Sequence, residues 1–177
     1  MGTDDDMRGK VLAALAARGL LAEDGATTTY GQPAWRDVPS EGGPQGLMDA
    51  NALQRRLVAC AHATPATGPD QCATWVENVL ASVGTPYVCG SARAIYEGFC
   101  HVTDLSGLLV GMVVAVGRHP FDASGWAHGH VGLYVGDACV MDCAGGRVRT
   151  APLAAWLSVY GVASEPRWGW LGTISLG

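Results

Sequence analysis

The segment that decides the fold is PDQCATWVENVL, at residues 69–80. Its apolar residues recur at helical spacing and predict an amphipathic helix that carries Cys72 in its first turn. Asp70 is expected to be the N-cap of this helix. The positive end of the helix dipole favours a thiolate over a thiol at Cys72. The segment therefore indicates a nucleophilic cysteine whose base must come from elsewhere in the chain.

The expected base lies in GHVGLYVGD, at residues 129–137, which is followed by VMD at residues 140–142. Strand alternation and a hairpin between these two segments can bring Asp142 beside His130. A carboxylate in that position fixes the tautomer of the imidazole and stabilises the imidazolium. We therefore predict that Cys72, His130 and Asp142 are the nucleophile, the base and the orienting residue. Backbone N–H groups at the start of the Cys72 helix are expected to hold an oxyanion.

The hydrophobic pattern changes from helical to strand-like along the chain, which predicts an α+β fold. Helices are expected at residues 6–22, 48–62, 71–84, 91–100 and 152–160, and strands at 109–116, 130–135, 138–143, 147–149 and 168–174. Residues 31–46 and 117–129 are expected to form surface connections, because glycine and other turn-forming residues recur in both segments.

The charge balance restricts the classes of partner. The chain has 11 Lys and Arg against 16 Asp and Glu, and the net charge of -5 without a basic stripe argues against nucleic acid as a partner. The apolar runs are too short to span a bilayer. The N-terminal residues 1–6 are acidic and lack the features of a secretory signal, so a role outside the cell would require another route of release.

Six cysteines are spread along the chain without a Cys-x-x-Cys motif. Their spacing forms no dense disulfide framework, and we expect most of them to be small buried hydrophobic residues. A bridge between Cys89 and Cys100 is left open by the sequence.

Two of these segments resemble a known group of enzymes. Residues 71–75 (QCATW) resemble the nucleophile helix of CHAP amidases. Residues 129–137 and 140–142 resemble the histidine strand and the third-residue strand of NlpC-type and CHAP cell-wall peptidases. The resemblance runs from about residue 69 to residue 161, and it is strongest in the histidine strand.

This resemblance implies a papain-like fold at residues 67–177, preceded by a helical extension at residues 1–66. It also implies a cysteine endopeptidase or amidase that cleaves an amide bond in the stem or cross-bridge peptides of bacterial peptidoglycan and needs no cofactor. The expected setting is a phage or prophage endolysin, made in the cytoplasm and released by holin-type lysis. An injected antibacterial effector is the alternative.

A second segment competes for the nucleophile position. Residues 104–108 (DLSGL) resemble the nucleophile motif of NlpC peptidases, and residues 86–90 (PYVCG) precede them as in that family. This alignment puts Leu105 in the place of the cysteine and predicts an inactive protein. We favour Cys72, because a helix follows Cys72 whereas a strand is expected directly after residue 108.

Each predicted role has a purely structural alternative. Cys72 can be a core cysteine, His130 a buried histidine of the sheet, and Asp142 the start of a turn. His128 and His130 are two residues apart and could ligate a metal from one strand face, but no third ligand has suitable spacing, so we expect no metal.

Four residues are expected to contact the substrate: Gln71, Tyr87, Trp126 and His128. Tyr87 and Trp126 can be either walls of a groove or core residues. Two rival functions remain at this point. One is an inactive module that binds wall peptide or a protein, and the other is a cysteine hydrolase or deamidase toxin that acts on a protein.

Overall fold

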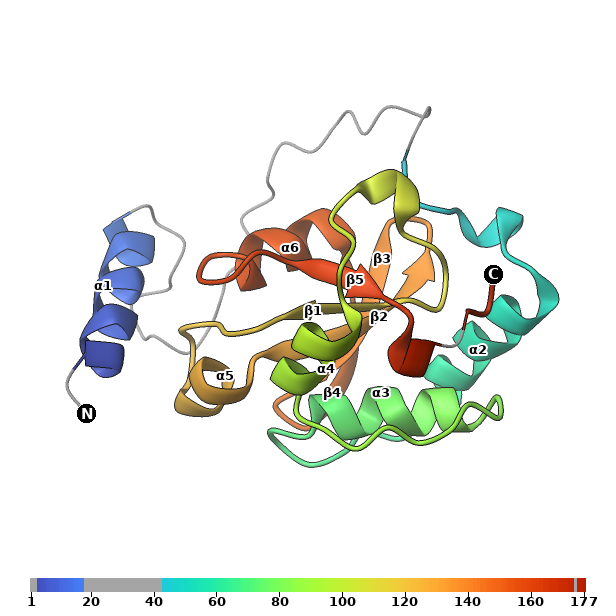
Figure 1. The fold of residues 1–177 in the computed structure, drawn as a ribbon, viewed down its shortest axis with the longest axis horizontal. Helices are drawn as coiled ribbons and strands as arrows, with labels where there is room; N and C mark the ends of the chain where they lie inside the picture. Colours follow the sequence, from blue (N-terminus) through green and yellow to red (C-terminus); the bar gives the residue numbers. More distant parts are fainter. Residues whose placement is uncertain (1–2, 18–42, 174) are drawn as a thin grey trace.

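Four α-helices precede the first strand, and two more lie between strands of the sheet, in the computed structural model, which describes residues 3–17, 43–173 and 175–177 (Figure 1). Within these ranges the fold is α+β, as predicted, with six α-helices and one antiparallel sheet of strand order β4-β3-β2-β1-β5. The helices are α1 (Thr3–Ala17), α2 (Ala52–Ala63), α3 (Cys72–Ala81), α4 (Ala92–Phe99), α5 (Ala123–His128) and α6 (Leu153–Tyr160). The strands are β1 (Val113–Val116), β2 (His130–Gly136), β3 (Cys139–Ala144), β4 (Arg147–Pro152) and β5 (Arg167–Gly169), and short 3₁₀ turns occupy Leu47–Asp49, Leu105–Gly107 and Leu171–Thr173.

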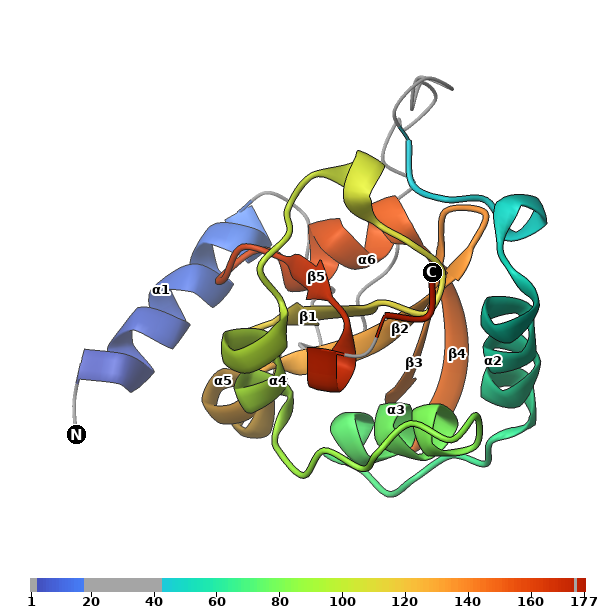
Figure 2. The same cartoon turned by 45° about the vertical axis from the view of Figure 1, so that its right-hand side comes forward.

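Helices α3 and α6 lie on opposite sides of strands β1 and β2 (Figures 1 and 2). Helix α3 packs on β2 and β3, and α4 packs on β1 and β2. Trp75 and Val76 of α3 and Leu133 of β2 are fully buried in the core between these layers. Each such side chain contributes roughly 1.5–3 kcal/mol by leaving water. The start of α3 is therefore held firmly against the two strands that carry His130 and Asp142.

Helix α2 belongs to the same core. Its Leu57 and Ala61 are fully buried and cluster with the core residues of α3. A capping box starts it at Ala52, because the Asn51 side chain accepts from the Gln54 backbone N–H while the Gln54 side chain accepts from that of Asn51. The expected helix at 48–62 therefore begins four residues later. A domain boundary after residue 66 stays a prediction.

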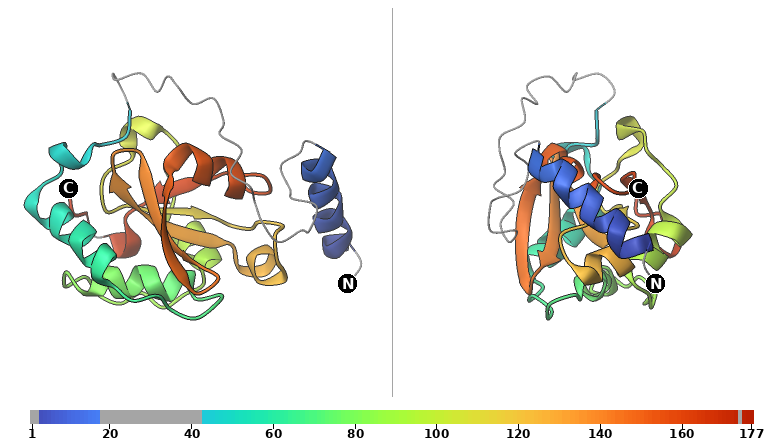
Figure 3. Two further views of the ribbon diagram at one scale, coloured as in Figure 1. Left: turned by 180° about the vertical axis from the view of Figure 1, so that it is seen from behind. Right: turned by 90° about the vertical axis from the view of Figure 1, so that its left-hand side faces the viewer.

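Helix α1 lies beside the α5 end of the molecule (Figure 3). The Arg8 side chain donates to the Pro120 carbonyl at 3.0 Å, and Arg118 pairs with Asp4 at 3.3 Å. The helix covers much of the expected range 6–22, but residues 18–22 and residues 31–42 of the expected connection lie outside the described residues. No helix in the described ranges is long and apolar enough to cross a bilayer.

Three expected elements are different in the structure. Regular strand pairing in the 109–116 segment begins only at Val113, because Gly111, at φ +94, turns the backbone. The 117–129 segment is not only a loop but contains α5, whose N-cap Asp122 accepts from the Gly125 N–H at 2.5 Å. The final strand stops at Gly169 and a 3₁₀ turn follows, with Gly172 at φ +68.

All six cysteines are free thiols. Cys89 is exposed and Cys100 is fully buried, so the bridge that the sequence left open is not formed. Cys72 and Cys143 are also buried, in agreement with the expectation of buried cysteines for those positions.

Candidate active site

Cys72 is the first residue of α3, and its exposed fraction is 9%. The expected N-cap role of Asp70 is wrong. Asp70 has φ +61 and turns the chain sharply, so Gln71 occupies the N-cap position and makes no side-chain capping bond. The first-turn N–H groups of α3 are therefore not used by a capping side chain, although they lie at the positive end of the helix.

The β2–β3 hairpin brings His130 and Asp142 together, as the alternation predicted. Gly132 pairs with Asp142, and His130 Nε2 lies 2.8 Å from Asp142 Oδ2. A carboxylate only accepts, so Nε2 carries a proton and the other ring nitrogen is left for Cys72, with which His130 is also hydrogen-bonded. Gly132 permits this close packing, because a Cβ there would lie 2.6 Å from Val140 Cγ1.

The Asp142 carboxylate is 1% exposed and is surrounded by donors. Arg149 donates to both of its oxygens, at 2.7 and 3.0 Å, and Trp156 Nε1 donates to Oδ2 at 2.9 Å. Burial raises the pKa of Asp142, but hydrogen bonds from His130 and Arg149 and their charges outweigh burial and hold the pKa well below its usual range. Asp142 therefore stays ionised although it is buried.

Opposing influences set the charges of Cys72 and His130. Burial raises the pKa of the Cys72 thiol, but the hydrogen bond to His130, its charge and the backbone N–H groups of Val131 and Ala73 lower it overall. Burial lowers the pKa of His130, whereas its bonds to Asp142 and Cys72 raise it to about 9. Both shifts favour a thiolate–imidazolium pair.

Cys100 provides an internal contrast. It is buried as Cys72 is, but it has no histidine partner, and burial raises the pKa of its thiol to about 12. Burial alone therefore raises the pKa of a thiol in this protein, and the lowered pKa of Cys72 comes mainly from His130.

Helix α6 fixes the plane of the His130 ring. Tyr160 stacks on His130, with ring centroids 4.3 Å apart and an interplanar angle of 26°, and Trp156 lies one helical turn earlier on the same face of α6. The Tyr160 hydroxyl is also hydrogen-bonded to Arg149. The two aromatic residues and the arginine thus hold the ring and the carboxylate as one unit.

A cleft of about 270 Å³ opens over this unit. Cys72 and His130 line it, and two of the four expected substrate contacts, Gln71 and His128, line it as well. Tyr87 and Trp126 do not. Tyr87 is half exposed and is hydrogen-bonded to Glu77, and Trp126 is buried with the Arg118 guanidinium 4.9 Å from its ring centroid.

The alternative of a metal on one strand face is not supported by the backbone. His128 is the last residue of α5 and His130 is the first residue of β2, with Gly129 at φ +74 between them. Across the described residues, no three His, Cys, Asp or Glu side chains are grouped so that they could hold a metal ion.

Sequence reasoning missed Arg149, Tyr160 and Trp156. A signal for Arg149 was present, because Gly145 and Gly146 form a two-residue turn with φ of +56 and +74. Such a turn pairs residues at equal distances on either side, and Asp142 and Arg149 are each three residues from it. The only sequence signal for Trp156 and Tyr160 was their spacing, which places both side chains on one face of a helix.

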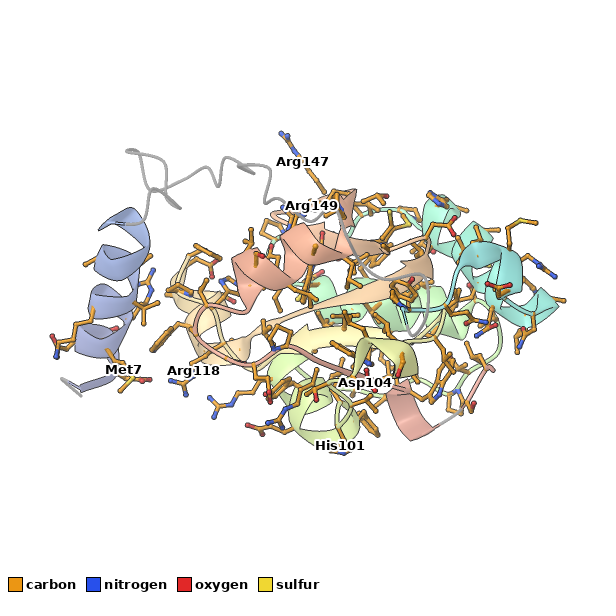
Figure 4. The ribbon with its side chains drawn as sticks, turned by 90° about the horizontal axis from the view of Figure 1, so that it is seen from above. Met7, His101, Asp104, Arg118, Arg147 and Arg149 are labelled. Carbon is orange, nitrogen blue, oxygen red and sulfur yellow. The ribbon has the colours of Figure 1, made fainter. Side chains whose placement is uncertain are left out.

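The competing segment at 104–108 is built differently. It forms a 3₁₀ turn at Leu105–Gly107 in which Asp104 accepts from the Ser106 N–H, and no α-helix follows before β1. The absence of a following helix agrees with the reason for preferring Cys72, although the strand expected directly after residue 108 begins only at Val113. Figure 4 shows Asp104 well apart from Arg149, and it shows Arg147 projecting away from the body.

No family model, curated protein or solved structure matches this chain. The chemical interpretation therefore rests on the geometry of the site. A thiol paired with a histidine, a carboxylate that orients the histidine, and backbone N–H groups at a helix start are the parts required for acyl transfer.

Proposed function

We propose that this protein is a papain-like cysteine hydrolase that cleaves an amide bond in bacterial peptidoglycan. The observation that carries the reaction class is the His130 ring, which is hydrogen-bonded to Asp142 on one side and to Cys72 on the other. The substrate class is supported by the resemblance of residues 129–137 and 140–142 to cell-wall peptidases. A cysteine at a helix start packed on an antiparallel sheet is in keeping with a papain-like fold.

Acylation begins from the thiolate–imidazolium pair. The Cys72 sulfur attacks the carbonyl carbon of the scissile amide, and a C–S bond forms while the carbonyl oxygen becomes an oxyanion. Backbone N–H groups at the start of α3 donate to that oxyanion. His130 then gives its proton to the amide nitrogen, the C–N bond breaks, and the amine leaves.

Deacylation reverses the role of His130. The neutral imidazole takes a proton from a water molecule, and the resulting hydroxide attacks the thioester carbon. The C–S bond breaks, the carboxylic acid is released, and the thiolate–imidazolium pair is restored. Asp142 stabilises the imidazolium in both halves of the cycle and keeps Nε2 protonated.

Digestion of purified peptidoglycan tests the proposal. The wild-type protein should release fragments with new amino and carboxyl ends, as measured by mass spectrometry, and Cys72→Ala should reduce the rate by roughly 10⁴-fold or more. Cys60→Ala, a change in α2 outside the site, is the control and should retain activity. Circular dichroism should show an intact fold in both variants.

Two results would contradict different parts of the proposal. Full activity of Cys72→Ala would remove Cys72 from the mechanism. A wild-type protein that leaves peptidoglycan intact, while Cys72 reacts rapidly with iodoacetamide, would overturn the substrate and leave a cysteine hydrolase directed at another amide, such as one in a protein.

A further inference from the structure

The cleft contains a second buried histidine that the mechanism above does not use. His119 lines the cleft, and its exposed fraction is 5%. Its ring is enclosed by aromatic neighbours, with centroids 5.1 Å from Tyr160, 5.4 Å from Phe121 and 5.8 Å from His130. Gly125 lies directly against the ring, and a Cβ there would be 1.9 Å from His119 Cε1. The packing thus selects an aromatic ring of this size at position 119.

Packing does not explain why the ring is an imidazole. His119 Nδ1 is sealed from solvent and has no hydrogen-bond partner, and no hydrogen bond to Nε2 is formed among the described residues. A buried polar group without a partner destabilises the fold, and phenylalanine would provide the same ring contacts without this cost. A bound molecule that pairs with the ring would account for the histidine.

The charge state of His119 restricts what it can bind. Burial and the positive charge of His130 lower the pKa of His119 to about 4, so the ring is neutral near pH 7. A neutral imidazole has one N–H and one lone pair. Because Nδ1 is sealed, the less costly tautomer leaves the lone pair there and places the proton on Nε2. Nε2–H is then a donor for an uncharged acceptor.

The position of His119 indicates which part of the substrate it would contact. In the proposed reaction His130 protonates the leaving nitrogen, so the amine-bearing part of the substrate lies next to the His130 ring. The His119 ring meets the His130 ring edge-on, with an interplanar angle of 85°. We propose that His119 is a substrate-binding residue whose Nε2–H donates to a carbonyl oxygen in the leaving-group portion of the peptide. This inference rests on the function proposed above.

The acyl-enzyme can react either with water or with an added amine, and the ratio of the two products reports on binding of the leaving-group portion. The probe is the ¹⁵N-labelled amine fragment that wild-type enzyme releases from labelled peptidoglycan, and it is added during digestion of unlabelled peptidoglycan. The amine nitrogen attacks the thioester, its proton passes to His130, and an amide is re-formed as the thiolate leaves. Mass spectrometry measures the ratio of labelled amide to hydrolysed product. This ratio does not depend on the amount of active enzyme.

Three substitutions distinguish the ring nitrogens. His119→Phe keeps the aromatic contacts and should lower the ratio about five- to tenfold, which is the effect of losing one neutral hydrogen bond. His119→Asn places its amide near the position of Nδ1 and should lower the ratio similarly. His119→Gln places an N–H group near the position of Nε2 and should retain most of the ratio. Iodoacetamide should label Cys72 at the wild-type rate in all three variants.

The possible outcomes distinguish a failure of this inference from a failure of the proposed function. An unchanged ratio in His119→Phe would overturn the role of His119 while the hydrolase stands. Equal losses in the Gln and Phe variants would overturn the Nε2–H contact. A wild-type protein that cleaves no peptidoglycan would overturn the proposed function, and this inference would fall with it.

Discussion

Residues 71–75 and 104–108 are the two candidate nucleophile segments of this chain, and they have different structures. Residues 71–75 start a ten-residue helix that packs on the central strands and brings Cys72 to His130. Residues 104–108 form a single 3₁₀ turn on the surface, and the Asp104 carboxylate accepts from the N–H and the hydroxyl of the neighbouring Ser106. The difference teaches that a nucleophile motif needs the helix that follows it, because that helix supplies the free N–H groups and fixes the sulfur against the sheet.

The largest contrast is expected between the two aspartates. Asp142→Ala leaves Arg149, Trp156 and His130 without their buried acceptor and should cost about 3–5 kcal/mol in the free energy of unfolding. Asp104→Ala removes an exposed turn carboxylate and should change stability little. Urea unfolding of both variants measures the difference, and equal losses would contradict the special status of the buried carboxylate.

The next contrast concerns thiol reactivity and pH. Iodoacetamide should label wild-type Cys72 at a lower pH than an ordinary thiol, because its pKa is lowered, and hydrolysis should fall as pH rises through about 9, where the His130 imidazolium loses its proton. In His130→Ala only burial and weaker backbone bonds remain, so the labelling midpoint should move to higher pH. Identical pH profiles for the two proteins would exclude an ion pair.

A smaller effect is expected for the arginine behind Asp142. Arg149→Met removes two donors from the carboxylate and should cost about 1–3 kcal/mol in unfolding free energy. Arg147→Met, two residues earlier on β4, is the matched control and should stay within about 0.5 kcal/mol of wild type, since Arg147 is exposed. Thermal unfolding would show the ranking, and a reversed order would refute the role assigned to Arg149.

The smallest effect is expected where a thiol is placed in the competing segment. Leu105→Cys in the Cys72→Ala background should restore no hydrolysis, because residue 105 lies in a 3₁₀ turn without a following helix. Peptidoglycan digestion is the measurement. Recovered activity in the double variant would identify residues 104–108 as the true nucleophile position.

Local patterns predicted much of the sheet and its hairpins. The β2–β3–β4 meander follows from alternation and glycine turns, and the contact between His130 and Asp142 follows from it. Helix α5 was missed because six residues are too short to show a helical period. The apolar residues on both sides of Gly111 led to a strand being predicted over the whole 109–116 run, although an isolated glycine in such a run can mark a turn.

The residues of the site also differ in whether local sequence patterns could predict their positions. Cys72 and His130 are 58 residues apart in sequence, and no local rule brings them together, so their contact depends on how α3 packs on the sheet. Arg149 could have been found by counting from the Gly145–Gly146 turn. His119 showed no pattern, because its place in the cleft depends on α5 and α6 together.

The two-residue turn at Gly145–Gly146 makes loop length a requirement of the site. Successive side chains on a strand alternate between faces, so one residue added to this turn would send the Arg149 guanidinium to the far side of the sheet. The ladder could re-form with its backbone bonds intact, while the buried carboxylate would lose its cation. A change in the length of this turn would therefore remove the cation from the buried carboxylate while the sheet stays paired, an effect that substitution scanning alone would not reveal.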